Sequence, residues 1–370
     1  MVGGGKASWV QMLSSASLSG SALLIPNLLR DEFDANTIEI GVITASFSAA
    51  LFCSSYYFGR YSDIHGRKMI LQVGLALTSV AIFMLIFADS VTSLALVRLL
   101  IGLCAGIYPS ALLAHVYDSD KKVGKFSAYG SLGFGVGVFL AGVISIYYEI
   151  FLACSILMFA AFTISLLMPF PTEKHHKVPF FPKEILRRNY PVYLSVMFRH
   201  TGANMIWVIY PLFLQDLGAA PWFIGTIYAV NAVAQFVFMN IVDRFSSKSL
   251  VAAGFIFSII TFPSYTLATE AWQIIPAQIT IAAAWSSLYV GSIKYVMERN
   301  EEKGTSAGLL QSSLSISAII GAICGGLAAY VYGYHGAMYI ATVLAILGLI
   351  VFYVSTRKVE GSLGKGINPV

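Results

Sequence analysis

Residues 59–68, with the sequence GRYSDIHGRK, form a short polar stretch between two long apolar runs. Asp63, Arg67 and Lys68 lie close together in this stretch. An ion is costly to move out of water unless it is paired, so these charges would gain nothing from an apolar environment. The pattern therefore predicts a tight polar turn at a membrane surface, between two helices that span the membrane.

The composition as a whole indicates a membrane protein. Hydrophobic residues make up 57% of the 370 residues and charged residues 11%, whereas a soluble domain has about 25% charged residues. One spanning helix needs about 20 apolar residues. The sequence predicts an all-α polytopic membrane protein of twelve spans, near residues 8–29, 38–58, 69–88, 92–114, 126–147, 150–169, 190–214, 222–242, 249–268, 272–296, 305–332 and 336–356.

One long polar segment, residues 170–189, separates the first six predicted spans from the last six. Its prolines and its basic residues suit a connection at the surface. We therefore expect an N-terminal six-helix half at 1–169, a cytoplasmic linker at 170–189, a C-terminal six-helix half at 190–356 and a cytoplasmic tail at 357–370.

The basic residues are distributed unevenly between the two sides of the predicted membrane. If the N-terminus is placed inside, 19 of the 23 lysines and arginines fall in the loops and termini of that side. The opposite loops hold only Arg30, beside several acidic residues. Because lysine and arginine are enriched on the cytoplasmic side, both termini are expected there, in a multi-pass protein of the plasma membrane.

The two halves share features in the same order along the chain. Asp63 after the second span corresponds to Asp243 and Arg244 after the eighth. Three further correspondences are Pro26 and Asp31 with Pro211 and Asp216, Ile40-Gly41 with Ile224-Gly225, and residues 121–124 with residues 298–304. Together they indicate a duplicated six-helix unit.

The spacing of Gly59, Asp63, Gly66, Arg67 and Lys68 resembles the signature loop between helices 2 and 3 of the major facilitator superfamily of transporters. The resemblance extends over essentially the whole chain and implies twelve helices in two pseudo-symmetric halves, with a substrate site between them. It also implies that Asp63 pairs with Arg67 and meets the start of helix 11, near Thr305, as a latch of the outward-open state. Asp243 and Arg244 would be the second-half counterpart, without the glycines.

Polar side chains inside the predicted spans are candidates for substrate binding or coupling. Arg98, which precedes Gly102 by four residues, resembles the arginine of the family's helix-4 motif, and a charge within a span is costly unless it is paired or meets water. Snorkelling to the outer surface is the alternative for Arg98. The candidates are Arg98, Arg199, His200, Asn204, Asn231, Gln235 and Gln311.

Glycines in the fifth span allow two interpretations. Gly133, Gly137 and Gly142 resemble the antiporter motif of exporters, although Val138 replaces its proline. Alternatively, these small residues form a face for close helix packing.

The sequence favours a secondary active transporter of a small solute, working by alternating access in efflux or exchange. One alternative is an organic-anion importer or exchanger that uses the buried arginines, because no acidic residue lies at mid-membrane depth. Another is a membrane receptor or sensor that transports nothing. Without a nucleotide-binding loop or metal-ligand spacing, we expect no enzyme, no cofactor and no metal, with proton or ion coupling left open. The expected partners are the lipid bilayer and the solute, with no nucleic acid, for a monomer.

Overall fold

A computed structural model describes residues 3–23, 25, 28–29, 32–35, 37–120, 122–144, 146–170 and 180–364. Its elements are all helical over this part of the chain. They are α1 Gly3–Leu23, α3 Thr37–His65, α4 Arg67–Phe83, η1 Met84–Phe87, α5 Val91–Ala105, α6 Pro109–Asp120, α7 Val123–Ile144, α8 Tyr147–Leu166, α9 Lys183–Asp216, α10 Pro221–Ile241, η2 Val242–Arg244, α11 Ser247–Ser264, η3 Tyr265–Leu267, η4 Ala271–Ile274, α12 Ile275–Arg299 and α13 Lys303–Gly364.

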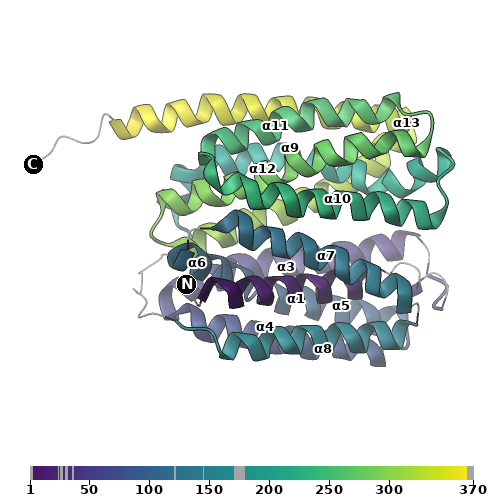
Figure 1. Ribbon diagram of the computed structural model, residues 1–370, viewed down its shortest axis with the longest axis horizontal. Helices are drawn as coiled ribbons and strands as arrows, with labels where there is room; N and C mark the ends of the chain where they lie inside the picture. The colour runs from purple at the N-terminus through teal and green to yellow at the C-terminus, as the bar shows by residue number, and fades with distance from the viewer. Residues whose placement is uncertain are drawn as a thin grey trace, which may run out of the picture. The chain divides into compact units, whose positions relative to one another are not determined.

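The helices group into two compact units. Unit 1 comprises Met1–Val178, Ala232–Asp243 and Glu301–Ser315, and unit 2 comprises Pro179–Asn231, Arg244–Asn300 and Ile316–Val370. In unit 1, α1 packs on α7 and α8, and α4 packs on α8, so that these helices run alongside one another (Figure 1). In unit 2, α12 packs against α9 and α11. Pro26, Asp31 and residues 171–179 of the predicted linker lie outside the described residues, and the division into halves at 169 and 190 stays a prediction.

The polar stretch 59–68 is more helical than the sequence predicted. Helix α3 continues to His65 and α4 begins at Arg67, so the turn is confined to Gly66. Gly66 has φ 97, a left-handed backbone that costs a side-chain-bearing residue about 1–2 kcal/mol. The prediction of a longer turn was wrong because a helix that extends beyond an apolar span leaves no trace in hydropathy.

Two other helix breaks lie at glycine or proline. The predicted span 92–114 is split into α5 and α6, because Pro109 has no N–H with which to continue the α5 hydrogen-bond ladder. The long helix α13 has non-helical backbone at Gly333, with φ 70, between the predicted spans 305–332 and 336–356. Among the described residues, eight helical stretches are long and apolar enough to cross a membrane, one of them Lys303–Lys358.

Glycines on α7 allow close packing against α1. A Cβ atom on Gly133 would lie 2.1 Å from the carbonyl oxygen of Met12, and one on Gly137 would lie 2.1 Å from that of Ala16. A Cβ on Gly142 would meet nothing within 4 Å, so Gly142 does not share this contact. The packing interpretation therefore fits the first two glycines and not the third.

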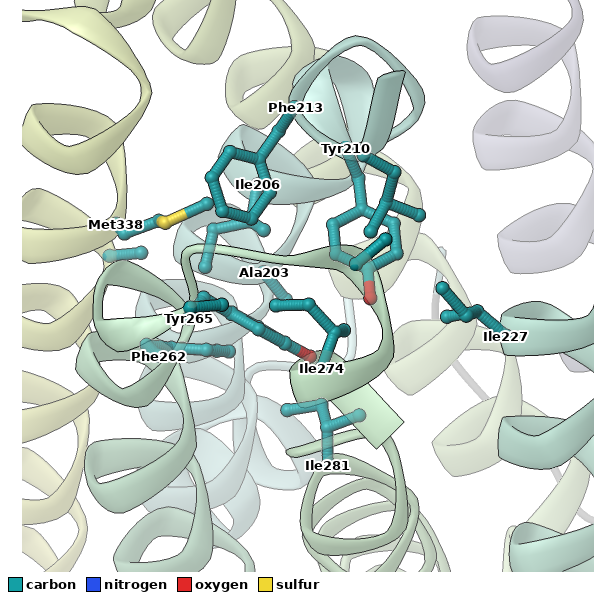
Figure 2. Packing of buried hydrophobic residues seen from close by; sticks show 14 of the residues in the cluster. Ala203, Ile206, Tyr210, Phe213, Ile227, Phe262, Tyr265, Ile274, Ile281 and Met338 are labelled. Atoms are coloured by element: carbon teal, nitrogen blue, oxygen red, sulfur yellow. The ribbon is translucent and has the colours of Figure 1, made fainter. Parts of the chain in front are cut away.

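The core of unit 2 is a cluster of buried aromatic and aliphatic side chains from α9, α10, α11, α12 and α13 and from the short segments η3 and η4. Figure 2 shows the rings of Tyr210, Phe262 and Tyr265 among Ile206, Ile281 and Met338, with small Ala203 between them. Tyr210 and Tyr265 bring two hydroxyl groups into this otherwise apolar interior, and these hydroxyls need hydrogen-bond partners.

Candidate functional site

The carboxylate of Asp63, at the end of α3, caps the start of α13 within unit 1. It accepts hydrogen bonds from the backbone N–H of Gly304 at 3.0 Å and of Thr305 at 2.7 Å, and from the Thr305 hydroxyl at 2.8 Å. The first N–H groups of a helix have no partner in their own helix, and this end carries a partial positive charge. Asp63 is only 3% exposed, so this anion is held by groups that the protein itself supplies.

Glycines let α3 and α13 approach closely enough for this contact. A Cβ on Gly59 would lie 2.6 Å from the carbonyl oxygen of Gly304, and one on Gly308 would lie 2.4 Å from that of Ser55. A Cβ on Gly304 would lie 3.0 Å from the carboxylate of Asp63 itself. Larger residues at these positions would therefore push the two helices apart.

A second carboxylate, Asp118 at the end of α6, extends the same cluster. It contacts both the guanidinium of Arg67 and the ammonium of Lys303, the first residue of α13. The Arg67 guanidinium also lies 3.8 Å from Asp63. Asp63, Arg67, Asp118 and Lys303, which we call the latch cluster, thus join α3, α4, α6 and α13, whereas Lys68 is exposed.

Asp243, in η2, makes a similar contact with the start of α7. It accepts hydrogen bonds from the backbone N–H of Gly124 at 2.7 Å and of Lys125 at 3.0 Å. A Cβ on Gly124 would lie 2.3 Å from the carbonyl oxygen of Met239, so a glycine is again needed at the capped helix start. Arg244, the other residue named for this loop, is exposed.

Two arginines are buried away from these clusters. Arg98 on α5 is 5% exposed and its guanidinium lies 4.4 Å from the ring of Phe47. Arg199 on α9 is 2% exposed and donates from Nε to the hydroxyl of Ser258 at 2.8 Å. No carboxylate forms a salt bridge with either arginine among the described residues. Each arginine therefore carries a charge whose contacts in the described part of the chain are with neutral groups.

The remaining candidates are divided between the two units. In unit 2, Asn204 donates to the carbonyl oxygen of His200 at 2.8 Å, one turn earlier on α9, and Asn231 donates to that of Gln278 at 3.2 Å. In unit 1, Gln235 accepts from Ser131 at 3.0 Å, and Gln311 is half-buried on α13. Of these four amides, Asn231 and Gln235 thus join different helices, whereas Asn204 bonds within α9.

A buried polar group in the core of unit 2, the amide of Gln278, was not predicted from the sequence. The side-chain amide of Gln278 donates to the hydroxyls of both Tyr210 and Tyr265, the second at 3.4 Å. Tyr210 on α9 lies 68 residues before Gln278 on α12, so periodicity along one helix could not reveal this contact. Asp118 and Lys303 were missed as well, although their signal was present: opposite charges at span ends on the same predicted side as Arg67.

A family model described as Major Facilitator Superfamily matches residues 7–191 and again residues 192–368. The chain belongs to the major facilitator superfamily. An uncharacterized MFS-type transporter of Methanocaldococcus jannaschii is 24% identical over 95% of this chain and 97% of its own. The quinolone resistance protein NorA of Staphylococcus aureus (strain COL) is 23% identical over 86% of this chain and 88% of its own.

Among solved structures, the human organic anion transporter MFSD10 superimposes with a TM-score of 0.81, at 14% identity, over 94% of this chain and 98% of its own. The predicted all-α fold of the major facilitator superfamily, with twelve helices in two halves, is confirmed by these matches. As a member of this superfamily the chain is a multi-pass membrane transporter and not an enzyme. Members of the superfamily generally need no cofactor, and coupling to ions is compatible with that.

Proposed function

We propose that this protein is a secondary active transporter that moves a small solute across the plasma membrane by alternating access, in efflux or exchange. The observation that carries the proposal is the capping of the α13 start by Asp63, a contact between helices that no covalent bond or loop enforces. Such a contact can form in one conformation and break in another, as alternating access requires. The latch cluster would then hold one state closed on the cytoplasmic side, where both termini would lie.

The relatives support efflux more than import. NorA, by its name a quinolone resistance protein, aligns over most of this chain.

The Asp243 contact with the start of α7 supports a second, weaker latch in the repeated half. Arg67 and Lys303 would stabilise the first latch through Asp118.

An organic-anion importer or exchanger is the second candidate. The buried Arg98 and Arg199, without carboxylate partners in the described part of the chain, support it, because a buried cation favours an anionic ligand. A receptor that binds a solute without moving it is the third reading, and flux distinguishes it from the other two.

The experiment is flux in proteoliposomes that contain the purified protein, with a cationic dye, an organic anion and a neutral solute, each with and without a pH gradient. We expect at least one solute to move faster than through protein-free vesicles, and Asp63→Asn to slow that flux severalfold. Binding of a solute with no flux would refute transport. Equal flux in Asp63→Asn and in the wild type would refute the latch.

A further inference from the structure

The guanidinium of Arg199 is held on one side only. Its Nε donates to the hydroxyl of Ser258, and that hydroxyl in turn donates to the carbonyl oxygen of Gly254 at 2.7 Å. Ser258 therefore supplies a neutral acceptor and no negative charge. Nη2 of Arg199 is buried and has no hydrogen-bond partner among the described residues.

A buried guanidinium with an unused hydrogen-bond donor destabilises the folded protein unless an anion or another polar group pairs with it. A buried charge that lacks its counter-ion strongly destabilises the folded protein, and charged side chains inside a membrane protein mark binding sites for this reason. Aromatic faces compensate in part: Cζ of Arg199 lies 5.4 Å from the ring centre of Phe262 and 5.7 Å from that of Trp285. Such cation–π contacts stabilise a buried guanidinium less than a paired anion does.

Trp285 is also the centre of an aromatic stack. Its ring lies 5.0 Å from that of Tyr289, one turn further on α12, at an interplanar angle of 19°. On the α9 side, the ring of His200 lies 5.1 Å from Trp285 at 23°. Trp285, Tyr289 and His200 are only partly buried, so the fully buried guanidinium lies one indole ring from accessible surface of unit 2.

The unused donor of Arg199 and the aromatic stack at Trp285 together favour one class of ligand. An unpaired guanidinium donor binds a carboxylate well, because both groups are planar and the hydrogen bonds are charge-assisted. Stacked rings next to that donor favour a planar aromatic body. We propose that unit 2 binds a small aromatic carboxylate, with its carboxylate at Nη2 of Arg199 and its ring against the stack of Trp285 and Tyr289. This rests on the proposed transport function, because it names the class of solute that is moved.

Equilibrium binding to the purified full-length protein in detergent tests this site without any flux. The probes are 4-nitrobenzoate, the neutral 4-nitrobenzyl alcohol with the same ring, and cyclohexanecarboxylate with the same charge but no aromatic ring. We expect nitrobenzoate to bind at least tenfold more tightly than either of the others. Arg199→Gln should remove the preference for the charged probe, and Trp285→Leu should remove the preference for the aromatic one.

Two matched controls lie away from the site. Arg357→Gln removes an exposed arginine that also stacks on a tyrosine, and Trp272→Leu removes an exposed tryptophan of η4. Both should bind nitrobenzoate as the wild type does. If Arg199→Gln does not fold, the affinities of the three probes for the wild type still test the anion site. Their affinities for Trp285→Leu still test the aromatic part.

The binding measurements test the anion site and the aromatic part of the proposal separately. Equal binding of nitrobenzoate and the alcohol, or an unchanged preference in a folded Arg199→Gln protein, would refute the anion site. Equal binding of nitrobenzoate and cyclohexanecarboxylate would refute the aromatic part. Binding as expected with no flux in proteoliposomes would refute transport and leave the site intact, whereas flux of another solute without nitrobenzoate binding would refute the site alone.

Discussion

Replacing Asp63 with asparagine tests the latch at a single atom. The aspartate accepts three hydrogen bonds, from the Gly304 and Thr305 amides and the Thr305 hydroxyl, at the partly positive start of α13. Asparagine keeps the size but loses the charge and turns an NH2 group toward one of these donors. A hydrogen bond to a charged group contributes about 1 kcal/mol more than a neutral one, which gives about 3 kcal/mol over the three bonds.

A loss of about 3 kcal/mol corresponds to about a hundredfold change in the equilibrium between closed and open latch. Hydrogen–deuterium exchange measures that equilibrium without a known substrate, because the Gly304 and Thr305 amides are protected only while Asp63 accepts from them. In Asp63→Asn we expect these two amides, followed in peptides that cover the start of α13, to exchange about a hundredfold faster.

The matched control is Asp89→Asn, which changes an exposed aspartate before α5 that accepts a hydrogen bond from the hydroxyl of Ser93 at 3.2 Å. It should leave exchange at Gly304 and Thr305 unchanged. Exchange in Asp63→Asn that stays within about threefold of the wild type, in a protein that still elutes as folded, would contradict the assigned strength of the latch.

Three further predictions concern packing and polar contacts. Gly133→Leu should prevent α7 from packing on α1 and reduce the folded fraction in size-exclusion chromatography, whereas Gly142→Leu, at a position with open space, should not. Asp118→Asn should release Lys303 and raise exchange at the start of α13 about tenfold, a smaller change than Asp63→Asn causes. Gln278→Leu should lower the thermal midpoint in detergent by about 2–6 °C, because two buried hydroxyls lose their donor; an unchanged midpoint would contradict this.

Local chemistry made part of this structure predictable. The apolar runs predicted the helices, and the polar stretch 59–68 predicted a turn, which the backbone confines to Gly66. The contact of Asp63 with the start of α13 came from a family resemblance, since 241 positions separate it from Gly304. The surroundings of Arg199 could not be predicted at all, because Ser258, Phe262 and Trp285 lie on helices that only tertiary packing brings to α9.

The two capped helix starts show where the glycines matter. The family resemblance makes Asp243 and Arg244 the second-half counterpart of the latch, in a loop that lacks the glycines of residues 59–68. The close approach, however, depends on the receiving helix, and both Gly304 and Gly124 leave no room for a Cβ atom. What distinguishes the two contacts is the next residue. Thr305 adds a hydroxyl donor to Asp63, whereas Lys125 offers Asp243 a backbone N–H at the same position and has no hydroxyl to add.

One charge-assisted hydrogen bond contributes about 1.5–3 kcal/mol, so Thr305→Val should remove much of the advantage of the Asp63 latch. Exchange at Gly304 that rises in Thr305→Val toward the rate at Gly124 would support this reasoning, and an unchanged rate would contradict it.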